Sequence, residues 1–381
     1  MIAVIADDFT GAAEICGLGL RRGLRVHLET EVSGTTDADL LVVATNTRSM
    51  NAVDARQEAE QVTRKLLELS PDYIYKKLDS VLRGHVYAEL LSQMQVCGKK
   101  RALVVPANPH FNRIIRNGVY YVDGLPLAKT YFASDPEFPV RYSEVKAILG
   151  KGQQEIHSLG NRDKLPDRGI ILGDVCTDED LQFWADRADR ETLLAGGSGF
   201  FEVVLGRDFP GLPQRAEPGM LHGKNALFIF GSTFPKDAVT MGNFREAGVN
   251  VLNLPGSLFR EKSVSAEIDR WSGKIAGEIN LRGELALSTA FPASAERIPA
   301  FTIRKIMGEL IGEVMQRVRV NNLFIEGGAT ASQILAVLEI RQLVPFLEVD
   351  SGVIQMHVPD REGLCITTKP GSYRWPELIR K

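Results

Sequence analysis

The sequence is poor in the residues that would build a zinc site, a disulfide framework or a membrane span. Its four cysteines, Cys16, Cys97, Cys176 and Cys365, lie far apart without a Cys-x-x-Cys pair, and its six histidines show no His-x-x-x-His spacing. We therefore expect buried, reduced thiols. No apolar run approaches the ~18–20 residues that span a bilayer, and Met1 leads into a strand-like run rather than a signal peptide. The default expectation is a cytoplasmic protein with no membrane partner.

The chain also lacks a strong charge bias and the common nucleotide-binding motifs. A net charge of −3 gives no electrostatic reason to expect a nucleic-acid partner. No Gly-x-x-x-x-Gly-Lys-Ser/Thr occurs, which excludes an ordinary P-loop. The glycines of 17–23 resemble a dinucleotide fingerprint only faintly, because the spacing is one residue too long and no strand precedes them. They predict a helix face packed closely on a sheet, followed by a helix stop.

The length and the pattern predict two α/β domains. A chain of 381 residues with 44% hydrophobic and 24% charged residues is globular and too long for one ordinary core. Between Gly206 and Lys224 stand three prolines and four glycines, which cannot sustain a helix or a central strand. We expect domains at 1–210 and 225–381, a linker at 211–224, and an active-site cleft between the domains.

Strand-like runs alternate with amphipathic helix-length segments, which favours βαβ units and mainly parallel sheets. Helices are predicted at Val53–Leu69 and Arg83–Val96, a capping box at Thr177–Asp180 opens another through Asp189, and a further helix begins near Pro235. Asp123-Gly124, between apolar runs, predicts a hairpin inserted near the site. The predicted strands are Ile2–Ile5, Arg25–Glu29, Leu40–Ala44, Tyr73–Tyr75, Ala102–Val105, Gly169–Leu172, Ala226–Phe230, Val251–Leu254, Glu284–Leu287 and Asn322–Ile325.

Two adjacent carboxylates follow the first predicted strand. Asp7, Asp8 and Thr10 come directly after it, and Gly11 opens a helical pattern. In open α/β sheets ligands bind beyond the carboxyl ends of the strands, and neighbouring carboxylates there need a cation, a metal or a substrate hydroxyl as partner. The plainer alternative is that Asp8 or Thr10 caps the next helix, which accounts for only one polar residue of the cluster.

Three more predicted strand ends carry polar loops. The run from Tyr75 to His85 contains Lys77, Asp79, Ser80 and Arg83, a set that can bind a small anion, or else a solvated charge run in which Ser80 caps a helix. Thr45–Ser49 adds Arg48, or is simply a turn before a helix cap, and the prolines of 106–112 hold an extended loop beside the same crevice. Four such loops in one domain favour a binding site.

The second half carries glycine turns after predicted strands. Gly327-Gly328 precedes Ala329 and Thr330 at a helix start, where free N–H groups and the helix dipole suit a phosphate. Gly231-Ser232 and the turn at Gly371 repeat this pattern. A single Gly-Gly is usually only a tight turn, but three such turns in one domain favour a nucleotide site.

Taken together, these motifs resemble the family of four-carbon acid sugar kinases, or tetronate kinases. The similar segments are Ile5–Ala12, Lys76–Gly84, Val119–Leu127, Gly231-Ser232 and Glu326–Ala331. The resemblance spans nearly the whole chain and is strongest before residue ~140. It implies an N-terminal acid-sugar domain, a C-terminal ATP domain, and phosphoryl transfer to a hydroxyl of threonate, erythronate or a 3-oxo-tetronate.

The resemblance and the chemistry of the residues together suggest individual roles, with Asp8, Arg48 and Lys77–Ser80 as the substrate ligands that the motif match itself implies. Asp8 would be the general base, with Asp7 or Asp79 orienting it or helping to hold Mg²⁺, which we expect mainly on the ATP phosphates. The expected substrate ligands are Asp8, Thr10, Arg48, Lys77, Asp79, Ser80 and Arg83, and the expected ATP ligands are Ser232, Gly327, Gly328, Ala329, Thr330 and Gly371.

The second half departs from the family at two points. Ala329 stands where a polar residue is usual, and Ser372–Trp375 replaces a Gly-Phe-Gly-like tail. An acid-sugar sensor or regulatory protein of the same fold with impaired ATP use is therefore the alternative. Which tetronate is used, and whether the chain forms a homo-oligomer, stay open.

Overall fold

The computed structural model describes residues 1–135, 138–150, 153, 155–210, 225–231, 237–260, 264–289, 298–371 and 375. The chain divides into two compact units, Met1–Gln214 and Arg215–Lys381. The predicted linker at 211–224 lies outside the described residues. In the part of the chain that is described, no helix has both the length and the apolar character needed to cross a bilayer.

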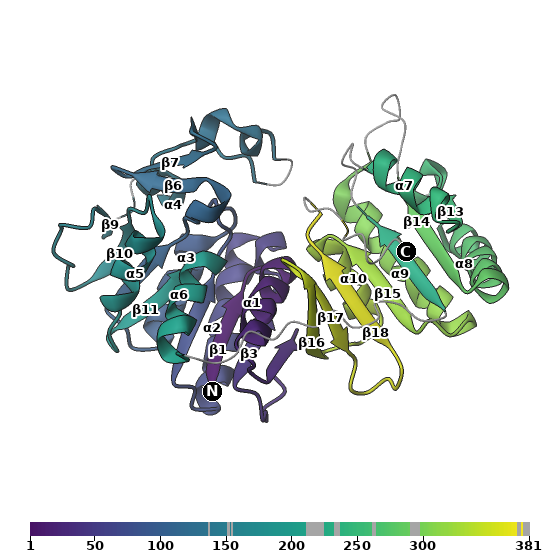
Figure 1. Cartoon of the computed structure of the whole chain (residues 1–381), viewed down its shortest axis with the longest axis horizontal. Coiled ribbons are helices and arrows are strands. Elements are labelled where there is room, and N and C mark those ends of the chain that lie inside the picture. Colours follow the sequence, from purple (N-terminus) through teal and green to yellow (C-terminus); the bar gives the residue numbers. More distant parts are fainter. Residues whose placement is uncertain are drawn as a thin grey trace. The chain divides into compact units, whose positions relative to one another are not determined.

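The first unit is built on a parallel sheet (Figure 1), with the strand order β2-β3-β1-β4-β11-β5-β10-β9. Its strands are almost entirely buried, as expected when helices cover both faces. They are β1 (Ile2–Ala6), β2 (Val26–Glu29), β3 (Leu40–Ala44), β4 (Tyr73–Lys77), β5 (Arg101–Val105), β9 (Ile156–Leu159), β10 (Gly169–Gly173) and β11 (Thr192–Gly196).

Helices pack on the two faces of this sheet. They are α1 (Phe9–Arg21), α2 (Ala52–Glu68), α3 (Val86–Val96), α4 (Val145–Gly150), α5 (Asp178–Asp186) and α6 (Ser198–Asp208). On one face Ile5 and Val43 form a core with Val62 of α2. On the other face α1 lies so close that a Cβ added at Gly19 would stand 2.6 Å from the Leu40 side chain, which confirms the close packing predicted for 17–23.

The order of β1, β3 and β4 creates a topological switch point. After β1 the chain crosses by α1 to β2, and after β3 it crosses back by α2 to β4, so neighbouring strands send their connections to opposite faces. The crevice at the carboxyl ends of two such strands is the usual ligand site of an open α/β sheet. The loops after β1 and β3 therefore lie where a ligand is expected to bind.

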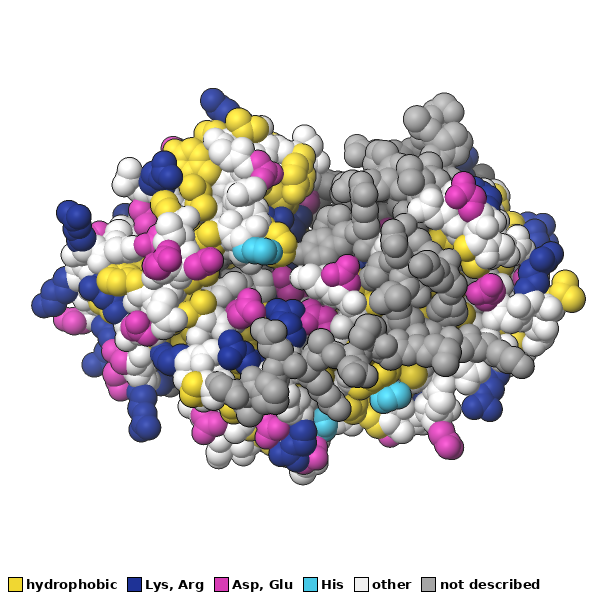
Figure 2. All heavy atoms as spheres, in the orientation of Figure 1, with side chains coloured by type: hydrophobic (Ala, Val, Ile, Leu, Met, Phe, Trp, Pro, Cys, Tyr) yellow, Lys and Arg dark blue, Asp and Glu magenta, His cyan; other side chains and the backbone are white. Residues whose placement is uncertain are grey.

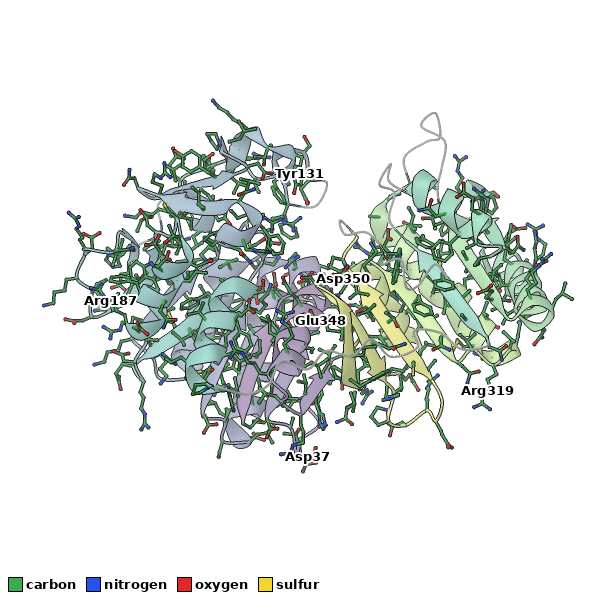
Figure 3. The ribbon with its side chains drawn as sticks, viewed as in Figure 1. Asp37, Tyr131, Arg187, Arg319, Glu348 and Asp350 are labelled. Atoms are coloured by element: carbon green, nitrogen blue, oxygen red, sulfur yellow. The ribbon has the colours of Figure 1, made fainter. Side chains whose placement is uncertain are left out.

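A small antiparallel sheet is inserted between β5 and β9. It consists of β6 (Arg113–Arg116), β7 (Val119–Val122) and β8 (Leu125–Pro126), and Asp123-Gly124 form the predicted two-residue turn. Both turn residues have positive φ, 50° and 78°, as the tight hairpin turn requires. Figure 2 shows hydrophobic side chains at the surface over this region, where Leu125 and Tyr131 are exposed, and Figure 3 labels Tyr131 at its border.

The second unit has the strand order β13-β14-β12-β15-β18-β17-β16 when taken by itself. Its first five strands are parallel and its last two pair antiparallel. The strands are β12 (Ala226–Phe230), β13 (Val251–Asn253), β14 (Glu284–Ser288), β15 (Asn322–Glu326), β16 (Gln342–Asp350), β17 (Val353–His357) and β18 (Cys365–Lys369), and the helices are α7 (Asp237–Glu246), α8 (Val264–Arg282), α9 (Ala300–Arg317) and α10 (Gly328–Val337).

Most predicted elements are confirmed, with ends shifted by a few residues. The capping box at Thr177 and Asp180 is present, but its helix ends at Asp186 rather than Asp189. The sequence missed β9, β11, β16, β17 and β18. All four cysteines are free thiols, yet only Cys16 is buried, so the expectation of buried thiols is wrong for the other three.

Candidate functional site

Three polar loops meet at the switch point of the first unit. Asp7 and Asp8 follow β1, a short 3₁₀ turn Thr47–Ser49 follows β3, and Leu78–Arg83 follows β4. Thr45 is tied to the end of β1 because both its backbone N–H and its hydroxyl donate to the Ala6 carbonyl, each at 2.9 Å. The backbone therefore fixes these loops against one another before any side chain contributes.

The polar side chains of these three loops form a cluster, and Arg48 lies at its centre. Its Nε and Nη2 donate to the two carboxylate oxygens of Asp7 at 2.8 and 2.9 Å, and Nη2 also donates to Asp8 Oδ1 at 3.0 Å. Its Nη1 lies 3.7 Å from Asp79 Oδ1. Burial alone would lower the pKa of Arg48, but the three carboxylates outweigh it and raise that pKa well above its usual value. The guanidinium is permanently charged and is shared by three acids.

Besides lying near Arg48, Asp79 forms a bidentate ion pair with Arg83. Arg83 donates from Nη2 to Oδ1 at 2.7 Å and from Nε to Oδ2 at 2.9 Å, and its backbone N–H adds a bond of 3.1 Å. Burial would raise the pKa of Asp79, yet Arg83 and Arg48 hold it well below the usual value. Asp79 is therefore an anion at working pH and a poor proton acceptor.

Asp8 is in a different electrostatic position. Its Oδ1 accepts from Gly11 N–H at 3.0 Å and caps α1, so the capping alternative is correct as far as it goes. Burial raises the pKa of Asp8, helped by the neighbouring charge of Asp7, and Arg48 only partly compensates. Asp8 is therefore a carboxylate whose affinity for a proton is increased, whereas that of Asp79 is decreased.

Lys77 and Thr10 are two further polar residues of the β1 and β4 ends that the sequence predicts at the site. Lys77 Nζ donates to the Leu78 carbonyl at 2.9 Å and lies 3.6 Å from Glu14 Oε2 of α1. A Cβ at Gly11 would come within 3.0 Å of that amine and 2.7 Å of Asp8 Oδ1, so glycine leaves room for both groups. Thr10 lies in the first turn of α1 and is half-buried.

The inserted sheet reaches this cluster, as the sequence predicts. Arg113 Nη1 donates to Ser80 Oγ, and Tyr120 Oη donates to the Ser80 carbonyl at 2.6 Å. Arg83 Nη1 donates to Asp135 Oδ2 at 2.7 Å. The β4 loop is thus held by the insertion as well as by the main sheet.

A buried network lies beneath the cluster. Lys76, which has no exposed surface, forms an ion pair with Glu89 of α3, and Thr47 donates to the same oxygen, Glu89 Oε2, at 3.0 Å. Thr47 belongs to the turn that carries Arg48. The network therefore fixes the turn from below.

The cationic side chains of this arrangement suit recognition of a small polar anion. Within the described ranges, no group of three or more His, Cys, Asp or Glu residues is arranged to hold a metal ion. The cluster instead offers one basic carboxylate, an amine, hydroxyls and arginines at one sheet edge. Such a set can orient a hydroxy acid and accept a proton from it.

The second unit brings its glycine turns together at the carboxyl edge of its sheet. Gly327 has φ +93° and precedes α10, whose first residues are Gly328, Ala329 and Thr330. The end of β12 lies against this turn, since a Cβ at Gly231 would stand 2.5 Å from Thr330 Oγ1. The first N–H groups of a helix have no partner within it and attract anions. Gly371 follows β18 at the same edge, whereas Ser232 lies outside the described residues.

Behind this edge the tail residue Trp375 has a structural role. It is buried beside Phe230 and Phe324, and its Nε1–H donates to Glu326 Oε2 at 3.1 Å. Lys369 donates to the same oxygen at 2.9 Å. The unusual residue Trp375 thus supports the strand that precedes Gly327, and 372–374 lie outside the described residues.

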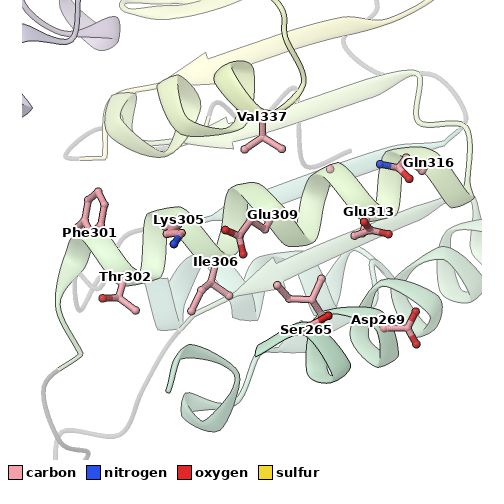
Figure 4. A pocket seen from close by; sticks show the side chains of 12 residues that line it. Ser265, Asp269, Phe301, Thr302, Lys305, Ile306, Glu309, Glu313, Gln316 and Val337 are labelled. Atoms are coloured by element: carbon pink, nitrogen blue, oxygen red, sulfur yellow. The ribbon is translucent and has the colours of Figure 1, made fainter. Parts of the chain in front are cut away.

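Two hollows of the described residues lie elsewhere. In the first unit, a hollow of about 820 Å³ is lined by Ile2, Tyr73 and Thr192, at the amino ends of the strands. In the second unit, a groove of about 750 Å³ lies among α8, α9 and α10 (Figure 4). Its charged lining residues are Asp269, Glu309, Glu313 and Lys305. This acidic lining would repel phosphate, so the groove is a poor nucleotide site.

The sequence missed several residues that contact the cluster, above all Arg113, Glu89 and Glu14. Arg113 directly follows the polar loop 106–112, and a basic residue at that point is a signal that could have been used. Glu89 and Glu14 lie on helices far from the motifs, and only the fold brings them to Lys76 and Lys77.

The family model and the relatives that match this chain all concern sugars or sugar acids. Residues 2–204 match the family model of a sugar-binding N-terminal domain. A D-threonate kinase of Salmonella typhimurium is 31% identical over 221 residues, which cover 53% of this chain and 52% of the relative. A D-threonate kinase of Bordetella bronchiseptica is 25% identical, with 99% and 95% covered. A D-erythronate kinase of Heliobacterium modesticaldum is 26% identical, with 73% and 67% covered.

Solved structures share the fold. A Haemophilus influenzae protein superposes with a TM-score of 0.75 at 18% identity, covering 99% of this chain and 98% of that one. The chain thus spans about half the length of the Salmonella typhimurium kinase, whereas the Bordetella bronchiseptica kinase and the Haemophilus influenzae structure are matched almost completely.

Proposed function

We propose that this chain, which belongs to the family of four-carbon acid sugar kinases, transfers the terminal phosphoryl group of ATP to a hydroxyl of a four-carbon sugar acid. The first unit would hold the acid, and the second unit would hold the nucleotide. The observation that carries the proposal is Asp8: a partly buried carboxylate with a raised pKa, at the switch point, near the Lys77 amine.

Asp8 would accept the proton of the attacking hydroxyl. A carboxylate is a better general base when its pKa lies nearer to working pH, and burial moves the pKa of Asp8 in that direction. Asp7 would orient Arg48, and Asp79 would stay ionised between Arg48 and Arg83. We propose that Thr10, Lys77 and Ser80 bond the oxygens of the acid, with Arg48 Nη1 facing it.

The glycine edge of the second unit would hold the ATP phosphates. Gly327 and the N–H groups of Gly328, Ala329 and Thr330 would face them, and we propose Ser232 and Gly371 as further ATP ligands. Gly231 supports this assignment, because a side chain there would collide with Thr330. When bound, ATP with Mg²⁺ supplies the phosphoryl group and neutralises its charge. We propose that Mg²⁺ is carried mainly by the phosphates.

The alternative, an acid-sugar sensor with impaired ATP use, rests on Ala329 and the altered tail. Ala329 still presents a backbone N–H in the first turn of α10, and Trp375 packs in the core. Neither residue removes a donor that the proposed phosphate site needs. Calorimetric titration with ATP and Mg²⁺ separates the two functions, because a pure sensor would bind the acid and no nucleotide.

The variant Asp8→Asn tests the proposed base. Asparagine caps a helix about as well as aspartate, so α1 should keep its cap. We expect kcat to fall by roughly 10²- to 10⁴-fold while the acid and ATP still bind. Asp37→Asn, at an exposed residue of the same unit (Figure 3), is the matched control. Near-normal turnover of Asp8→Asn with any accepted acid would remove Asp8 as the base.

A further inference from the structure

Three arginines approach the loop after β4, and they differ in what they already bind. Arg48 holds Asp7 through two nitrogens, and Arg83 holds Asp79 in the same way. The Arg113 side chain donates to a neutral acceptor, Ser80 Oγ. Among the described residues, no carboxylate forms an ion pair with Arg113. Its positive charge is therefore not yet neutralised at the place where an acid would bind.

The backbone and an aromatic ring keep Arg113 at this place. Its N–H and carbonyl exchange hydrogen bonds of 3.1 and 2.8 Å with Asn108, which fixes the start of β6 to the loop after β5. Its guanidinium carbon lies 5.7 Å from the centre of the Phe132 ring, over which Arg83 also lies at 5.3 Å. The side chain is half-buried and is aimed at Ser80 rather than at bulk solvent.

We propose that Arg113 is the specificity-determining ligand for the carboxylate of the acid substrate, an inference that rests on the proposed function. On binding, the guanidinium would exchange the Ser80 hydroxyl for a carboxylate, a bidentate, charge-assisted partner that binds roughly twice as strongly. Ser80 Oγ would then be free to bond a hydroxyl of the same molecule.

Energetics favour Arg113 over its two neighbours for this task. If Arg48 or Arg83 turned to the substrate, the buried carboxylate of Asp7 or Asp79 would lose its partner, which is strongly unfavourable. Arg113 gives up only a neutral hydrogen bond. The inserted sheet would thus bind the carboxylate of the substrate, and the loops at the strand ends of the main sheet would bind its hydroxyls.

A purely structural role makes a different prediction. If Arg113 served only to lock the insertion onto Ser80, its loss would weaken charged and uncharged ligands alike. If it binds the carboxylate, its loss would weaken acids and spare neutral molecules of the same length. The preference for acid over polyol is therefore the discriminating quantity.

The experiment is calorimetric binding of hydroxy acids of three to six carbons and of the matching neutral polyols. It compares the unaltered chain with Arg113→Gln, Arg113→Lys and the control Arg116→Gln, an exposed arginine of the same strand. We expect Arg113→Gln to weaken acid binding by about 10- to 100-fold and polyol binding by less than about 2-fold. Arg113→Lys should recover part of the loss, because it keeps the charge without the fork.

The outcomes separate this inference from the kinase proposal when ADP release is measured in parallel. An acid preference unchanged in both Arg113 variants overturns the inference and leaves a working kinase intact. Equal weakening of acids and polyols also overturns it. If Arg113→Gln selectively loses acid binding while the unaltered chain binds acids but releases no ADP with any of them, the inference about Arg113 is supported and the kinase proposal is contradicted. No binding of any acid by the unaltered chain overturns both.

Discussion

Arg48 and Asp7 form a two-pronged ion pair, with Nε 2.8 Å from Oδ2 and Nη2 2.9 Å from Oδ1. Both side chains are largely buried, and the Arg48 backbone N–H donates to the Asp7 carbonyl at 3.1 Å. The loop after β3 is thereby fixed to the loop after β1. Since Arg48 Nη2 also reaches Asp8, this pair sets the position of the proposed base.

Arg48→Lys tests that dependence. Lysine keeps the charge but loses the fork, so Asp7 and Asp8 can no longer both be held. We expect kcat/KM for the acid to fall by about 10- to 100-fold and KM for ATP to change little. Initial rates of ADP release give both constants. Arg64→Lys, at an exposed pair with Glu60, is the control, and equal behaviour of the two variants would contradict the account.

Asp79→Asn should be most harmful at neutral pH. The ion pairs with Arg83 and Arg48 lower the pKa of Asp79, so its stabilising effect is present above the unfolded-state pKa of 3.8 and is lost as pH falls through the folded-state pKa. We expect a loss of ~3 kcal/mol in the free energy of unfolding at pH 7 and a smaller difference toward pH 3. Denaturant unfolding at several pH values measures it. A difference that does not depend on pH would show that Asp79 is not held as an anion.

The pair Lys76–Glu89 should behave as a buried ion pair. Glu89→Gln leaves the Lys76 ammonium buried without a counter-charge and should destabilise the chain by ~3–5 kcal/mol. The double change Lys76→Met with Glu89→Leu should recover most of that stability. It should still impair turnover, because Thr47 loses its acceptor beneath Arg48. Full activity of a stable double variant would mean that the network does not position the turn.

Gly231→Ala should affect the nucleotide side alone. The added Cβ would stand 2.5 Å from Thr330 Oγ1 and force the end of β12 away from the first turn of α10, at a cost of ~1–3 kcal/mol in stability. We expect weaker ATP binding by calorimetry and unchanged binding of the acid. Gly242→Ala, where nothing lies within 4 Å of the added carbon, is the control. Unchanged ATP affinity in Gly231→Ala would argue against a phosphate site at this edge.

Local patterns in the sequence predicted much of the first unit and of its cluster. Asp7, Asp8, Arg48 and Asp79 could be placed together because each follows a buried parallel strand, and parallel strands end at one edge. Partners that depend on helix packing could not be predicted, such as Glu89 for Lys76. Nor does a motif reveal that Arg48 is already engaged by carboxylates, because that depends on distances between loops.

The missed strands have physical reasons. In β11, Thr192–Gly196 is short and ends in glycine, so it looks like a turn although it lies between β4 and β5. In β16, Pro345 and alternating polar residues argue against a central strand, and β16 is indeed the outermost strand of the second unit taken alone. Its bulged pairing with β17 further blurs the alternation.

The central claim, phosphorylation of a four-carbon sugar acid, is tested most directly by ADP release with ATP and Mg²⁺. The panel would contain D- and L-threonate, D- and L-erythronate, their 3-oxo forms, 4-hydroxythreonine and the neutral four-carbon polyols. A site built to bond hydroxyls can discriminate by as much as ~10⁴-fold, so we predict one or two strong hits among the acids and none among the polyols. A flat response across the panel, with ATP shown to bind, would contradict the claim.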